Sequence, residues 1–231
     1  MRGLDLFCCA GGISVGYHDV GFEMVGVDIE KHAYPYEFHQ MDWEEALDTF
    51  DLSAFDFIHA SPPCQGYTAL KAVHGNYWPL LIEPVRERLD KIGLPYVIEN
   101  VQGAPMRRDL TLCGEMFGLG VIRHRYFELG GWKMGSPAHK PHRGRVAGWR
   151  HGELFDGPYF AVYGEGGGKG TVAQWQKAMG IDWTSDRREL AEAIPPAYGR
   201  WIGSALHDHL AWRAALVSVL GRTSHNIEDV A

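Results

Sequence analysis

The chain has 231 residues, 45% of them hydrophobic, which is enough for one substantial α/β domain with a small insertion. Its formal net charge of -7 argues against a protein that binds nucleic acid through overall charge alone. No apolar run is long enough to span a membrane, and Asp5 interrupts the start of the chain, so the pattern predicts a soluble, cytoplasmic protein without a signal peptide.

The four cysteines are Cys8, Cys9, Cys64 and Cys113. None of them forms a C-x-x-C pair, so their spacing indicates neither a zinc site nor a disulfide framework. Reduced thiols fit a cytosolic protein.

The chain opens with a predicted strand over residues 3–7, which leads through a turn containing Gly11 and Gly12 into a helix over residues 13–20. Such a turn lets a ligand approach the backbone and points helix amides at it. The next predicted strand, residues 23–27, ends at Asp28. An acid there is suited to ribose hydroxyls or, equally, to capping a helix.

The stretch 57–67 contains the first candidate nucleophile. An apolar run ends at Ala60, a Pro62-Pro63 step forces an extended turn without amide donors, and Cys64 follows. A thiol on a rigid loop at the end of a strand is typical of a nucleophile in an α/β enzyme, although a structural cysteine fits the local pattern as well. A loop over residues 66–77 and a helix over 79–92 are expected next.

A further predicted strand, residues 95–98, runs into Glu99-Asn100-Val101. Glu99 would lie at the same edge as Cys64, as a general acid or as an ion-pair partner. Two more strands are predicted over residues 107–113 and 126–129. Arg123 and Arg125 precede the second of these and, as alternate residues, would share one face.

Residues 130–170 lose periodicity and are predicted to form a small inserted domain or a long loop with little helix. Residues 123–150 contain seven Lys or Arg and one acid, a net charge of +6, together with Trp132 and Trp149. A basic, aromatic segment on an acidic body predicts a localised surface for a polyanion, with a solvated loop as the alternative. The Gly-rich run 164–171 does not have P-loop spacing. Helices are expected over residues 172–179, 187–193 and 198–219, before a polar tail.

Five motifs occur in a fixed order: Asp5-Leu6-Phe7 with Gly11-Gly12, Ser61-Pro62-Pro63-Cys64-Gln65, Glu99-Asn100-Val101, Arg123-x-Arg125, and Ile194-Pro195-Pro196-x-Tyr198 with Ile202-Gly203. Over about residues 1–128 and 172–210, this order is similar to that of the DNA (cytosine-5) methyltransferase family.

The resemblance implies a Rossmann-like α/β domain that depends on S-adenosylmethionine, formed by residues 1–129 and 171–221. Residues 130–170 would be a target-recognition insertion, and residues 222–231 a tail. The implied activity is methyl transfer to C5 of a flipped-out cytosine in double-stranded DNA. We expect a monomer without a metal, in the cytoplasm of a prokaryotic cell or a virus-infected host.

The resemblance also implies site residues. Cys64 would attack cytosine C6, Glu99 would act at N3, Arg125 would hold the O2 edge and orient Glu99, and Arg123 or Arg125 would raise the thiolate fraction of Cys64. The cofactor would contact Phe7, Ala10, Gly11, Gly12, Asp28, Ile29, Asp42, Pro63 and Ser204, with Asp42 facing the adenine amino group. Nucleic acid would contact Gln65, Lys140, Arg143, Arg145 and Arg150.

Three positions depart from the family's usual pattern: Cys9 replaces a Gly, Val121 a Gln and Ser204 an Asn. The recognition insertion is also short, which predicts a short target, such as a guanine-containing dinucleotide. A cytosine-5 RNA methyltransferase of the transfer-RNA type, a non-catalytic DNA-binding relative and an enzyme that modifies a mononucleotide remain as alternatives. Intact Cys64 and Glu99 argue against the non-catalytic relative.

Overall fold

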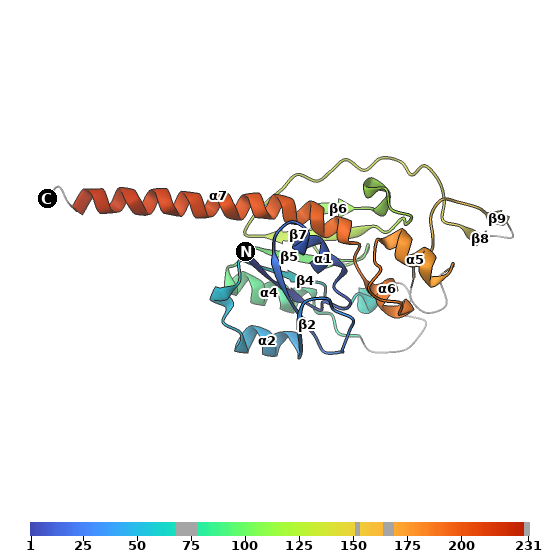
Figure 1. The fold of residues 1–231 in the computed structure, drawn as a ribbon, viewed down its shortest axis with the longest axis horizontal. Coiled ribbons are helices and arrows are strands. Elements are labelled where there is room, and N and C mark those ends of the chain that lie inside the picture. Colours follow the sequence, from blue (N-terminus) through green and yellow to red (C-terminus); the bar gives the residue numbers. More distant parts are fainter. Residues whose placement is uncertain (68–77, 151–152, 164–168, 229–231) are drawn as a thin grey trace.

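Seven strands form one sheet with the order β3-β2-β1-β4-β5-β7-β6 (Figure 1). The computed structural model describes residues 1–67, 78–150, 153–163 and 169–228. Five strands are parallel: β1 (Arg2–Leu6), β2 (Glu23–Asp28), β3 (Glu37–Gln40), β4 (Phe57–Ala60) and β5 (Tyr96–Asn100). Strand β7 (Arg125–Gly130) runs antiparallel to β5 and to β6 (Leu110–Leu112). This mixed sheet confirms the predicted α/β class.

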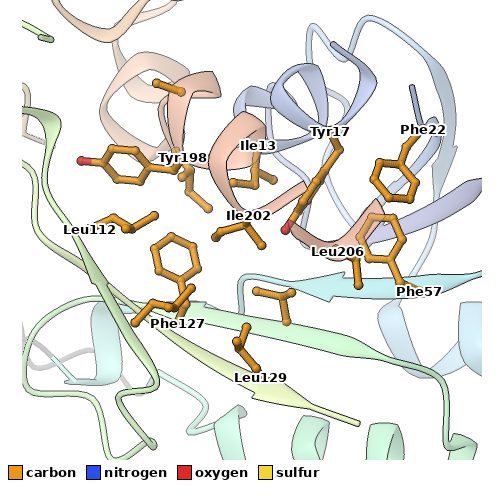
Figure 2. Close-up of a cluster of buried hydrophobic side chains, with 14 of the residues drawn as sticks. Ile13, Tyr17, Phe22, Phe57, Leu112, Phe127, Leu129, Tyr198, Ile202 and Leu206 are labelled. Atoms are coloured by element: carbon orange, nitrogen blue, oxygen red, sulfur yellow. The ribbon is translucent and has the colours of Figure 1, made fainter. Parts of the chain in front are cut away.

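Helices cover both faces of the sheet, because successive strand residues point to opposite sides and both sides are apolar. Helices α1 (Gly12–His18) and α7 (Pro196–Glu228) pack on the face that includes Phe57, together with Tyr17 and Tyr198 (Figure 2). Helices α2 (Trp43–Thr49) and α4 (Ile82–Ile92) belong to the core on the other face, which includes Ile58.

Two glycines allow α1 and α7 to cross closely. A Cβ on Gly16 would lie 2.1 Å from the carbonyl oxygen of Pro196, and a Cβ on Gly199 would lie 2.3 Å from that of Ile13. Side chains would therefore push the helices apart. The crossing brings the Pro195-Pro196 motif beside the helix that follows the Gly11-Gly12 turn.

A third core joins helices α5 (Val172–Met179) and α6 (Arg187–Glu192) to Val121 and Val162 through Trp175 and Leu190. The segment between β7 and α5 contains a small hairpin, β8 (Gly148–Arg150) and β9 (Glu153–Phe155), and its described residues form no helix. The absence of helix from these described residues agrees with the prediction for residues 130–170.

The structure adds elements that the sequence pattern did not predict. Strand β3 and helix α2 are short and were missed, and helix α7 continues to Glu228, so the predicted helix end at residue 219 was wrong. Figure 1 shows α7 extending well beyond the sheet, where Trp212 and Val217 are exposed. Among the described helices, none is both long and apolar enough to cross a membrane.

Candidate active site

The carboxyl ends of β1, β2, β4 and β5 meet at one edge of the sheet, which is where open α/β sheets bind ligands. Leu6 is paired with Val27 on one side and with Ala60 on the other, and Ala60 is paired with Ile98. The segments that follow these residues therefore lie along one edge. They include the Gly11-Gly12 turn, Asp28, the Pro62-Pro63-Cys64 loop and Glu99-Asn100.

The loop that carries Cys64 is fixed by the neighbouring strand. Asn100, at the end of β5, donates a hydrogen bond from Nδ2 to the carbonyl of Pro62 at 2.8 Å. The amide of Ser61 donates to the carbonyl of Leu6 at 3.1 Å. The two prolines have no amide to satisfy, and these two contacts link the turn to the neighbouring strands. Cys64 is half-buried at the end of the turn.

Glu99 forms an ion pair with Arg125, whose Nε lies 2.8 Å from Glu99 Oε1. Strand pairing explains the contact, because Glu99 is opposite Phe127, and Arg125 lies two residues from Phe127 on the same face of β7. Burial raises the pKa of Glu99, against the lowering effects of Arg125, Arg123 and a hydrogen bond with Ser61. Glu99 is therefore more readily protonated near neutral pH than an ordinary glutamate, as a general acid requires.

The Cys64 thiol is less acidic than an ordinary cysteine. Arg125 and Arg123 both lower its pKa, as expected, but burial has the largest effect and Glu99 adds to it, so the pKa is raised overall. The two arginines therefore favour the thiolate, in the direction expected of them, and burial opposes them.

Arg123 links several segments through hydrogen bonds, and its positive charge also acts on Cys64. Its guanidinium donates to the carbonyl of Val162 at 2.9 Å and to that of Ala191, and its own carbonyl accepts a hydrogen bond from the Tyr198 hydroxyl at 2.6 Å. Burial lowers its pKa to about 9. These contacts leave Arg125 as the arginine that pairs with Glu99.

The turn after β1 uses a backbone conformation that favours glycine. Phe7, Cys9 and Gly11 have φ angles of 60°, 46° and 73°. A side chain in this region costs about 1–2 kcal/mol, so Cys9, the departure noted above, is strained where a glycine would not be. Asp28 compensates through its Oδ2, which accepts a hydrogen bond from the Cys9 amide at 3.0 Å.

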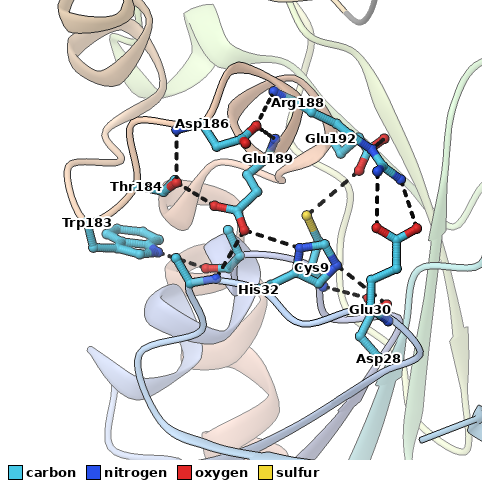
Figure 3. A network of polar contacts seen from close by, with 12 residues as sticks. Cys9, Asp28, Glu30, His32, Trp183, Thr184, Asp186, Arg188, Glu189 and Glu192 are labelled. Atoms are coloured by element: carbon cyan, nitrogen blue, oxygen red, sulfur yellow. Dashed lines mark hydrogen bonds and ion pairs between the residues drawn. The ribbon is translucent and has the colours of Figure 1, made fainter. Parts of the chain in front are cut away.

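His32 connects this turn to helix α6. Its ring lies 3.5 Å from Asp28 Oδ1 and 3.2 Å from Glu189 Oε1 (Figure 3). The hydrogen bond with Asp28 is the main cause that raises the pKa of His32, against burial. Burial alone would raise the pKa of Asp28, but hydrogen bonds from His32 and from the amides of Glu30 and Cys9 leave it lowered. Asp28 is thus an ionised acceptor at the strand end.

The sequence analysis missed His32 and Glu189, because a single His and a single Glu in polar stretches give no signal. Trp183 was missed as well. Its Nε1 donates to the carbonyl of Ala10 at 2.8 Å, so the segment before α6 fastens the Gly turn from the C-terminal side (Figure 3).

The other predicted cofactor residues differ in their placement. Ile29 is 64% exposed beside Asp28, Phe7 packs 6.0 Å from the ring of Trp43, and Pro63 precedes Cys64. Asp42 caps helix α2 by accepting from the amide of Glu44 at 2.8 Å. Ser204 is exposed on α7, and its hydroxyl donates to the carbonyl of Arg200, away from the turn.

Four of the five predicted nucleic-acid residues lie in the insertion, and Gln65 lies in the loop after Cys64. Lys140 is exposed, and Arg143 is 75% exposed with its Nε 2.6 Å from Glu115 Oε1. Arg145 is exposed, and Arg150 lies in β8 with a side chain outside the described set. Gln65 opens a 3-10 turn, Gln65–Tyr67, directly after Cys64. Most of the loop predicted over residues 66–77 lies outside the described residues.

Trp132 does not contribute to a basic, aromatic surface. It is 5% exposed, and its Nε1 donates to the carbonyl of Tyr96 at 3.1 Å, so it belongs to the core of the sheet. The expectation that it faces a polyanion was wrong. A group of one Cys and three His beside the insertion was missed: Cys113, His124, His139 and His142. The His139-x-x-His142 spacing was the available signal.

Comparisons with known proteins agree with this geometry. Residues 1–103 match the family described as C-5 cytosine-specific DNA methylase. Over 117 residues the chain is 31% identical to the Type II methyltransferase M.HgiCI of Herpetosiphon aurantiacus. That match covers 45% of this chain but 28% of the relative, so the chain spans much less than the relative's length.

Two solved structures share the fold over nearly the whole chain. A Dnmt2 variant from Spodoptera frugiperda is 13% identical, with a TM-score of 0.60, and the match covers 89% of this chain and 99% of that one. The Dnmt2 methyltransferase of S. pombe is 14% identical with a TM-score of 0.55, covering 90% and 98%. At this identity the similarity concerns the fold alone, and it confirms the predicted Rossmann-like α/β fold.

Proposed function

We propose that the chain belongs to the DNA cytosine-5 methyltransferase family, whose sequence pattern residues 1–103 match, and that it transfers a methyl group from S-adenosylmethionine to C5 of cytosine in double-stranded DNA. The observation that carries the proposal is the Arg125–Glu99 ion pair of 2.8 Å beside Cys64. A thiol, a buried carboxyl and a guanidinium are the groups that this reaction needs.

Cys64 would act as the nucleophile. Cytosine C5 is unreactive in the aromatic ring, and attack of a thiolate at C6 converts the ring into an enamine whose C5 can accept a methyl group. Glu99 is one of the groups that raise the pKa of Cys64. We therefore expect protonation of Glu99 to favour the Cys64 thiolate, because it removes a nearby negative charge.

Glu99 would donate its proton, or a strong hydrogen bond, to cytosine N3 as negative charge develops in the ring. Arg125 would hold Glu99 in place and bind the O2 edge. After methyl transfer the C5 proton is lost to a base, and the bond between Cys64 and C6 breaks. Arg123 would act here through its charge, since its terminal nitrogens already donate to Val162 and Ala191.

The residues at the Gly turn suit S-adenosylmethionine. Asp28 is an ionised acceptor for a ribose diol, and a carboxylate has more acceptor positions than its present contacts occupy. The exposed Ile29 beside it offers an apolar surface to an adenine ring. When bound, the cofactor supplies the electrophilic methyl group. Phe7, Ala10, Gly11, Gly12 and Pro63 would line the same pocket, and Asp42 and Ser204 remain predictions from the resemblance.

The target carbon is inaccessible inside a stacked duplex, so the cytosine would have to be flipped out, and Gln65 would enter the vacancy. The insertion would read the neighbouring bases. It offers few cations and no Asn or Gln, and at least half of protein–DNA hydrogen bonds go to phosphate and sugar groups. With one or two arginines left for base edges, a short guanine-containing target of about two to four base pairs follows.

A mechanism-based trap tests the proposal. Duplex DNA that carries 5-fluorocytosine is incubated with the full chain and S-adenosylmethionine, and covalent complexes are separated under denaturing conditions. Fluorine at C5 cannot be removed as a proton, so the enzyme stays attached through Cys64. Mass spectrometry of the attached peptide should identify Cys64. Methylation of transfer RNA in preference to duplex DNA, or attachment at another cysteine, would refute the proposal.

A further inference from the structure

A second cluster of reactive side chains lies outside the candidate active site. Cys113 directly follows β6 and His124 directly precedes β7. These strands are antiparallel, and Leu112 is paired with Arg125. The next position in this register therefore brings Cys113 beside His124, although ten residues separate them in the sequence.

The insertion supplies two more imidazoles to the same place. The Nε2 atoms of His124 and His139 are 3.0 Å apart. The ring centroids of the three histidines lie 4.9 to 5.1 Å from one another, with His142 as the third member. One potential ligand atom from each histidine and the sulfur of Cys113 all lie within 4.8 Å of one another.

The surrounding groups are arranged as they are around metal ligands. Glu115 Oε2 lies 2.7 Å from Nδ1 of His142, which leaves Nε2 of that ring to point elsewhere. A carboxylate on the second ring nitrogen is the usual partner of a metal-bound histidine. The backbone amides of Glu115, Arg123 and Met116 lie within hydrogen-bonding reach of the Cys113 sulfur and would stabilise a metal-bound thiolate.

We propose that Cys113, His124, His139 and His142 bind one zinc ion in a tetrahedral site. Ligand atoms in such a site are roughly 3.5 Å apart, given zinc–ligand bonds of about 2.0–2.3 Å. Small side-chain rotations from the observed arrangement reach this spacing. A cluster of nitrogen and sulfur ligands favours zinc over magnesium or calcium, which prefer oxygen.

Four protein ligands would fill the coordination sphere of zinc, so the site is structural and not catalytic. Its position defines its role. Two ligands belong to the sheet beside Arg123 and Arg125, and two belong to the insertion, so the ion fastens the insertion to the sheet next to the Glu99–Arg125 pair. Glu115 strengthens the link, since it also binds Arg143 in the insertion.

Metal analysis of the purified full chain tests this inference without reference to activity. We expect one zinc per chain in the wild-type protein and in Cys64→Ser, whose cysteine lies outside the cluster. The double variant His139→Ala/His142→Ala should lose the zinc. His18→Ala/His39→Ala is the matched control, because it removes two histidines from elsewhere, and it should keep the metal.

Cobalt substitution adds a spectroscopic readout. The cobalt form should show the strong visible bands of a tetrahedral site and a sulfur-to-cobalt charge-transfer band that disappears in Cys113→Ala. If Cys113→Ala fails to fold, zinc titration of metal-free wild-type protein against a coloured chelator gives the stoichiometry. Absence of tight zinc binding in that titration, or full retention of zinc by the double histidine variant, would overturn the inference. Neither result depends on methyl transfer.

Discussion

The catalytic edge of the sheet and the contact between insertion and sheet are built by different means. At the catalytic edge, Asp28, Cys64 and Glu99 are at or soon after the ends of parallel strands, so the sheet itself brings them together. The insertion instead meets the sheet through side chains from three separate segments: Cys113 after β6, His124 before β7, and His139 with His142 in the insertion. The first region should therefore depend on strand packing, and the second on what binds to those side chains.

The largest expected effect is a loss of activity at the catalytic edge that leaves the insertion unchanged. Replacing Cys64 by Ser should reduce methyl transfer to background, because an alcohol is a far weaker nucleophile than a thiolate at neutral pH. Radiolabelled methyl incorporation into duplex DNA measures the loss. DNA affinity and melting temperature should stay close to those of the wild type, because the insertion and its attachment are untouched. Substantial turnover by this variant would exclude covalent catalysis by Cys64.

The next effect concerns proton donation at the same edge. Glu99→Gln should lower kcat by about 10²–10⁴-fold, the usual contribution of a general acid. Glu99 works in its protonated form, and burial raises its pKa, so its contribution should be present at low pH and fall as pH rises through that pKa. Glutamine does not titrate, so this alkaline decline should be absent from the pH profile of the variant. A profile identical to that of the wild type would remove Glu99 from proton transfer.

The catalytic edge could be predicted from the sequence because its signals are local. Each strand is an apolar run, and the polar residue after it lies at the edge by necessity; Asp28 and Glu99 follow this rule. What could not be predicted is how burial and charge combine. The arginines near Cys64 lower its pKa as expected, but the depth of the thiol, which no pattern reveals, decides the outcome.

The insertion contact escaped prediction because its residues are close only through the fold. The distance between Cys113 and His124 in the sequence does not indicate a shared site until β6 and β7 are known to pair. The search for a C-x-x-C pair also overlooks a site with one cysteine and three histidines. Trp132 was misplaced for a related reason. Its basic neighbours in the sequence suggested an exposed ring, but the fold buries it. Strand β3 was missed because Phe38 is its single apolar residue, so it gives no apolar run.

A smaller effect is expected at the cofactor side of the catalytic edge. Asp28→Ala should weaken S-adenosylmethionine binding about tenfold or more, equivalent to ~1.4 kcal/mol, because a charged acceptor for the ribose is removed. Isothermal titration calorimetry measures the change. Glu30→Ala is the control, because Glu30 is exposed nearby and pairs with Arg188 at 3.0 Å. Equal affinities in wild type and Asp28→Ala would remove Asp28 from the cofactor site and leave it only its contacts with Cys9, Glu30 and His32.

The smallest effect tests whether the insertion is the DNA-reading region. Replacing Arg143 and Arg145 by Ala should weaken DNA binding modestly. The slope of log K against log salt concentration should become shallower by about one unit for each phosphate that the variant no longer neutralises. The matched control, Arg88→Ala/Lys91→Ala, removes two positive charges from helix α4 and should leave the slope unchanged.

Arg143 forms an ion pair with Glu115. When Arg143 is replaced, Glu115 loses this partner and keeps its contact with His142. If Arg143 contacts DNA, it must exchange its ion pair with Glu115 for one with a phosphate. Its contribution to the free energy of DNA binding is then smaller than that of an arginine without such a partner. Glu115→Gln weakens this competition and should therefore strengthen DNA binding, whereas Arg143→Ala weakens it. If both substitutions weaken binding equally, Arg143 serves to anchor the insertion and the reading residues lie elsewhere.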